Sequence, residues 1–125
     1  MKLAVVVALV TLAVASCSPF IPVTNLNEVP PDQMRDALNV RLVRTGAAAP
    51  KVVQYLGQVA GNSCKHLMTD PPPTTNDALL RMRVEAAKRG ANVVMDVTCD
   101  GAGADAWGTN CWESVSCKGV AVKGE

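Results

Sequence analysis

Five cysteines in 125 residues constrain the fold of this chain more than any other feature. Disulfides persist in oxidising compartments, whereas cysteines in reducing compartments more often bind metal or take part in catalysis. The spacing contains no Cys-x-x-Cys pair, which disfavours both a zinc knuckle and a thioredoxin-like redox site. What the cysteines do therefore depends on the compartment, which the N-terminal residues indicate.

Residues 1–16 have the layout of a cleaved signal peptide. Lys2 precedes the apolar run Leu3–Val14, and the small residues Ala15 and Ser16 follow it. The run is shorter than the roughly 20 apolar residues that a transmembrane helix needs. We therefore expect an exported protein without a transmembrane helix in its mature form.

Cys17 directly follows this segment. The sequence Val-Ala-Ser-Cys at residues 14–17 resembles the bacterial lipobox, in which cleavage exposes a cysteine that carries acyl chains. The alternative is an ordinary secretory signal in which Cys17 is incidental. We expect lipidation of Cys17, and Ser18 in place of Asp is typical of an outer-membrane lipoprotein whose domain faces the periplasm.

Residues 17–39 are predicted to form the lipid anchor and a proline-containing tether. Four prolines interrupt this stretch, and the residues after Cys17 could reach roughly 70 Å if fully extended. Asp32–Leu38 could form a helical turn, but such a short isolated helix would be marginal. We expect a periplasmic domain that comprises residues 40–125.

The pattern of this domain predicts two strands, a helix and two further strands. The strands are expected at Val40–Val43, Val52–Ala60, Asn92–Thr98 and Glu113–Lys123, and the helix at Asn76–Arg89. Gly57 and Gly61 are expected to mark a bulge or the end of the second strand. The fold class is therefore α+β, with one helix packed on a small, about four-stranded sheet. Because large apolar residues are few, two disulfides are expected to stabilise it.

The predicted helix carries two rows of apolar residues. Met82 belongs to the row expected to face the sheet, whereas Leu80 and Val84 belong to the second row. The second row is covered by a disulfide-held loop in one interpretation and forms a partner-binding ridge in the other. The sequence does not separate the two interpretations.

Four cysteines remain once Cys17 is set aside, and they allow three pairings. If the last two strands pair as an antiparallel hairpin across a symmetric loop, Cys99 lies opposite Cys117. Cys64 then pairs with Cys111, and the two disulfides interlock along the chain rather than nest.

Several classes of function are disfavoured by composition. Acidic and basic residues almost balance, so the chain has neither a basic field for nucleic acid nor an acidic tail, and nucleic-acid binding is not expected. His66 is the single histidine, and no catalytic triad or phosphate-binding loop is recognisable. We expect no enzyme activity, no cofactor and no metal site. Trp107 and Trp112 either fill space near Cys111 or expose aromatic surface for a partner.

The residues between about Val40 and Lys123 resemble the RcsF family, the outer-membrane lipoprotein sensors of the Rcs envelope-stress phosphorelay. The resemblance is carried by Leu56–Cys64, Asp70–Pro72, Arg81-Met82, Ala91–Val94, Cys99, Gly108–Cys111 and Cys117–Gly119. It implies the disulfides Cys64–Cys111 and Cys99–Cys117, the pairing that the hairpin also favours. The chain departs from the family in its short, slightly acidic tether.

The resemblance implies signalling through protein–protein binding. Members associate with the β-barrel assembly machinery and outer-membrane barrel proteins, and on damage they engage an inner-membrane repressor of the phosphorelay. The alternative is a structural envelope lipoprotein that has the same fold with two disulfides and no signalling role. On sequence alone, the candidate partner-binding residues are Trp107, Trp112, Leu80 and Val84.

Overall fold

The structure is a computed structural model that describes residues 25–102 and 111–125. The signal peptide, Cys17, Ser18 and Trp107 lie outside the described residues. Within the described parts of the chain, no helix is long and apolar enough to cross a membrane.

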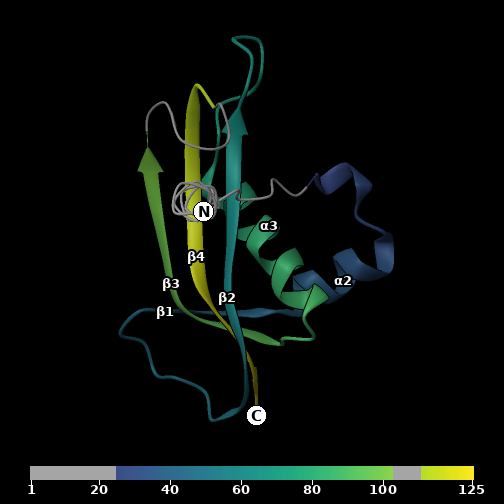
Figure 1. The fold of residues 1–125 in the computed structure, drawn as a ribbon, viewed down its shortest axis with the longest axis vertical. Helices are drawn as coiled ribbons and strands as arrows, with labels where there is room; N and C mark the ends of the chain where they lie inside the picture. Colours follow the sequence, from purple (N-terminus) through teal and green to yellow (C-terminus); the bar gives the residue numbers. More distant parts are fainter. Residues whose placement is uncertain (1–24, 103–110) are drawn as a thin grey trace, which may run out of the picture.

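A four-stranded mixed sheet with two helices on one side forms the domain (Figure 1). The elements, in chain order, are the 3-10 helix η1 (Leu26–Glu28), α2 (Pro31–Asn39), β1 (Arg41–Arg44), β2 (Val52–Lys65), α3 (Thr75–Lys88), β3 (Val93–Ala102) and β4 (Glu113–Gly124). The strand order is β1-β3-β4-β2, in which β1 runs parallel to β3 and the other neighbours are antiparallel. The predicted α+β class is confirmed.

β2 and β4 form the longest pairing of the sheet, from Val52 opposite Gly124 to Lys65 opposite Glu113. The register shifts at Gly57, whose φ of 93° places it in the left-handed region that glycine tolerates, so Gly57 is the expected bulge. Arg89 Nη1 donates hydrogen bonds to the carbonyls of Leu56 and Gln58, on either side of this bulge. Gly61 does not end the strand, which continues for four more residues.

α3 begins and ends where local chemistry favours it. Thr74 Oγ1 accepts a hydrogen bond from Asp77 N at 3.1 Å, which caps the N-terminus. Gly90, with a φ of 80°, follows the last turn and donates from its N–H to Ala87 O. The predicted helix is thus confirmed to within one residue at each end.

The core lies between α3 and the sheet. Ala78, Met82 and Ala86 are fully buried there, against residues of β2, β3 and β4 that include Val59, Val94 and Ala121. Gly61 is the point of closest approach, because a Cβ at this position would overlap the Ala78 carbonyl oxygen and the Met82 backbone. The first apolar row of α3 therefore faces the sheet, as predicted.

The second row of α3 is covered in a way that the sequence did not predict. Val84 is 0% exposed, and α2 contacts α3 on the side away from the sheet (Figure 1). Ala37 of α2 is also fully buried. A helix rather than a disulfide-held loop therefore provides the cover, and the interpretation of Val84 as part of a partner-binding ridge is wrong.

The same contact corrects the expected extent of the tether. The expected anchor and tether cover residues 17–39 with at most a marginal helical turn at Asp32–Leu38, but Pro31–Asn39 is a nine-residue helix packed on α3. Proline at its first position suits a helix start, and burial of Ala37 supplies the tertiary contact that an isolated helix lacks.

Candidate functional site

The Cys99–Cys117 disulfide joins β3 to β4 across a directly opposed pair of residues. The register places these two cysteines opposite each other, and their Cα atoms lie 4.1 Å apart. Cys117 is fully buried in the core cluster, whereas Cys99 is exposed. The antiparallel hairpin that the sequence suggested is confirmed, together with its disulfide.

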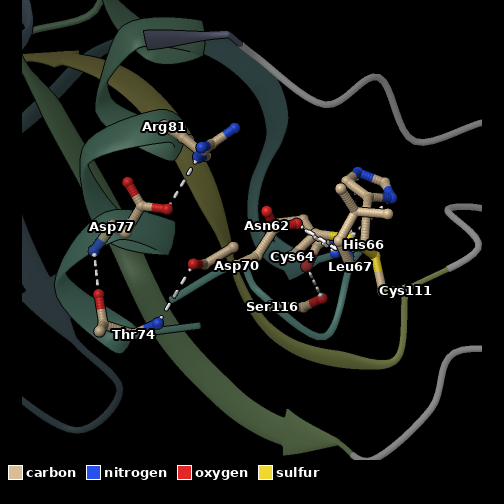
Figure 2. Close-up of a disulfide and its surroundings, with 11 residues drawn as sticks. Asn62, Cys64, His66, Leu67, Asp70, Thr74, Asp77, Arg81, Cys111 and Ser116 are labelled. Carbon is tan, nitrogen blue, oxygen red and sulfur yellow. Dashed lines mark hydrogen bonds and ion pairs between the residues drawn. A yellow bond between two sulfur atoms is a disulfide. The ribbon is translucent and has the colours of Figure 1, made fainter. Parts of the chain in front are cut away.

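The Cys64–Cys111 disulfide joins the end of β2 to the residue that enters β4. Its Cα atoms lie 5.5 Å apart, and Trp112 N donates to Lys65 O at 2.8 Å beside it. Cys64 is half-buried and Cys111 is buried. This disulfide therefore fixes the end of the sheet that Figure 2 shows.

Removing the Cys99–Cys117 crosslink should destabilise the domain. In the chain-entropy model, this disulfide restrains the unfolded chain by about 3 kcal/mol, so Cys99→Ala together with Cys117→Ala should lower the free energy of unfolding by about that amount. Urea unfolding of the mature chain, followed by tryptophan fluorescence, measures the difference. An unfolding free energy equal to that of the parent would contradict the expected role.

The loop after β2 is organised by the Asp70 carboxylate. Asp70 Oδ2 accepts hydrogen bonds from His66 N at 3.0 Å and from Leu67 N at 2.9 Å, and Asp70 N donates to Leu67 O. Leu67 and Met68 are nevertheless 61% and 80% exposed. The loop thus has a defined backbone and an apolar outer surface.

His66 lies against the Cys64–Cys111 disulfide (Figure 2). Its ring nitrogens are 3.4 and 3.6 Å from Cys64 Sγ, and the ligand atoms of His66 and both cysteines lie within 4.8 Å of one another. Metal ligation by cysteine requires the thiolate, and both sulfurs here are bound to each other. The oxidised group therefore offers a metal ion only the imidazole.

A groove of about 440 Å³ lies on the side of the sheet that carries α3, between β1, β3 and the start of α3. Its lining residues are Leu42, Arg44, Thr75, Leu79, Val97 and Cys99. β1 pairs with β3 only as far as Val97, so the rest of β3 has β4 as its described neighbour (Figure 1). The groove therefore combines apolar walls with a nearby strand edge, the kind of surface that can accept an extended peptide segment.

The structure describes three of the four candidate partner-binding residues. Trp112 is 61% exposed at the Cys64–Cys111 end, and Leu80 is half-buried on α3. Val84 is buried, and Trp107 lies outside the described residues. Sequence reasoning did not select the groove residues or the pair Leu67 and Met68, although apolar side chains next to the Pro71–Pro73 run are a signal for such a loop.

Comparison with known proteins supplies the family. The model of the RcsF lipoprotein family matches residues 25–124, a range that includes η1, α2 and all four strands. No curated protein matches the chain. The family supports signalling rather than the structural-lipoprotein alternative. The chain thus belongs to the RcsF lipoproteins, non-enzymatic sensors that are anchored in the outer membrane and activate the Rcs phosphorelay.

Proposed function

We propose that the domain passes the stress signal on by binding the inner-membrane repressor of the Rcs phosphorelay. A sensor without catalysis changes its target only by binding one state of that target more tightly than another. We also propose that the β-barrel assembly machinery and outer-membrane barrel proteins bind it before stress. The lipid would be attached at Cys17, after removal of residues 1–16.

The groove beside β3 is the proposed contact surface for the repressor. Leu42, Leu79 and Val97 give it apolar walls, and Arg44 supplies a cation at its rim. An apolar recess with a few polar groups is the usual form of a specific binding site. The groove is the observation that carries this proposal.

Filling the groove should reduce signalling without unfolding the domain. Thr75 is exposed and lines the groove, so Thr75→Trp places a bulky ring where the partner segment would lie. We expect induction of Rcs-dependent transcription by envelope damage to fall to near its resting level. A transcriptional reporter in a strain that carries only the variant protein measures this.

Asn76→Trp is the matched control. Asn76 is the next residue of α3, is also exposed and does not line the groove. It should leave induction unchanged, and immunoblots under non-reducing conditions should show equal amounts of disulfide-bonded protein for both variants. Normal induction by a folded Thr75→Trp protein would show that the groove is not the contact surface for the repressor.

A further inference from the structure

Three large apolar side chains are exposed where β2 ends and β4 begins. Leu67 and Met68 lie in the loop after β2, and Trp112 N donates a hydrogen bond to Lys65 O at the end of that strand. In Figure 1 the loop after β2 forms the end of the molecule opposite the C-terminus. Leucine, methionine and tryptophan beside a lysine are typical of surfaces that enter the boundary between lipid headgroups and acyl chains.

The start of the described chain lies close to the Cys64–Cys111 disulfide. Asn25 shares the lining of one pocket with Cys64, His66 and Arg81. If Cys17 carries the lipid, the eight residue steps from Cys17 to Asn25 span about 28 Å at most. The packing of α2 on α3 prevents the residues after Pro30 from extending this reach. Because Asn25 lies close to Cys64 and His66, this short anchor keeps the end of the domain that carries Leu67, Met68 and Trp112 within reach of the bilayer.

The backbone of the loop is suited to a less polar surrounding. The N–H groups of His66 and Leu67 already donate to Asp70 Oδ2, and Leu67 O accepts from Asp70 N. Backbone groups that enter an interface without partners lose their hydrogen bonds to water at a high free-energy cost. This loop can move Leu67 toward acyl chains without exposing those groups.

We propose that Leu67, Met68 and Trp112 dock on the lipid surface of the membrane that anchors the protein. The short reach of the anchor holds these side chains at a high effective concentration near lipid, whereas a protein partner must diffuse to them. The proposal rests on lipidation of Cys17 and is independent of the groove. Docking would hold the domain in one orientation on the membrane, with the C-terminal end directed away from it.

Tryptophan quenching tests this docking. The lipidated mature protein carrying Trp107→Phe, which leaves Trp112 as its single tryptophan, is reconstituted into vesicles of phosphatidylethanolamine and phosphatidylglycerol. Some of the lipids carry bromine in the upper part of the acyl chain. We expect brominated lipid to quench Trp112 and aqueous acrylamide to quench it weakly, and Met68→Asp to abolish the lipid quenching.

Val53→Asp is the matched control. Val53 is 66% exposed near the opposite end of β2, so its charge should leave the quenching of Trp112 unchanged. Flotation of the vesicles with the protein shows separately that the lipid anchor is present. Floating protein whose Trp112 responds only to acrylamide would overturn the proposal. Protection of Trp112 in native outer membranes but not in protein-free vesicles would also overturn it, in favour of a protein partner.

Discussion

Ser18→Asp should make the Rcs response constitutive. Asp after the lipidated cysteine is expected to retain the lipoprotein in the inner membrane, where the proposed partner resides. With a chain of at most about 28 Å between Cys17 and Asn25, the domain would stay beside that membrane at a high effective concentration. Rcs-dependent transcription in unstressed cells, together with membrane fractionation, measures the effect.

Two variants test the steps of this expectation. Cys17→Ala should leave the protein unanchored or unprocessed and should remove the constitutive response. Cys99→Ala with Cys117→Ala in the Ser18→Asp background should weaken it, because Cys99 lines the groove and the loss of this disulfide destabilises the domain. A relocated, folded Ser18→Asp protein that leaves transcription at its resting level would contradict binding to an inner-membrane partner.

Gly61→Val should prevent the domain from folding stably. Its Cβ would overlap the Ala78 carbonyl oxygen and the Met82 backbone, neither of which can rotate away. α3 would have to separate from β2, so we expect a loss of more than about 3 kcal/mol in the free energy of unfolding. Small domains have only about 5 to 15 kcal/mol in total. Thermal unfolding and the yield of disulfide-bonded protein report the change.

Gly101→Val is the control for this substitution. Gly101 also lies within a strand, but a Cβ there would meet no atom within 4 Å, and its φ is not in the left-handed region. The variant should be at least as stable as the parent, because valine favours strands. Equal stability of the Gly61→Val and Gly101→Val proteins would show that the close approach of α3 to β2 does not limit packing.

Local patterns predicted most of the sheet, the central helix and the disulfides. Alternation of β-branched residues located the strands, and Thr74 and Gly90 bounded α3, because capping depends on neighbouring residues alone. The disulfide pairing followed from the hairpin of β3 and β4. The parallel pairing of β1 with β3 could not be predicted, because residues 45 to 92 separate the two strands. No sequence pattern near either strand indicates that they pair.

The packing of α2 on α3 could not be predicted for a related reason. Met34, Ala37 and Leu38 mark a weak apolar face, and α2 has no side-chain cap at its N-terminus. Its stability comes from packing on α3, which is a tertiary effect that overrides marginal helix propensity. The buried state of Val84 depends on the same contact, so the sequence could not distinguish a covered residue from a partner-binding one.

The groove required the folded chain because its residues come from β1, α3 and β3. In the sequence, the patterns around Leu42, Leu79 and Val97 are those of ordinary core positions. The exposed loop could not be predicted for another reason. Leu67 and Met68 lie in a polar stretch without periodicity, and the hydrogen bonds to Asp70 that shape the loop are visible only in the structure.

The interleaved order of the two disulfides bears on how the domain would respond to proteases of the envelope. Cys99 lies between Cys64 and Cys111, and Cys111 lies between Cys99 and Cys117. A single peptide-bond cleavage anywhere from residue 64 to residue 117 therefore leaves at least one disulfide spanning the cut. A nicked molecule stays a single covalent unit, still attached to the segment that leads to Cys17, so one proteolytic event in this region cannot release a fragment of the sensor.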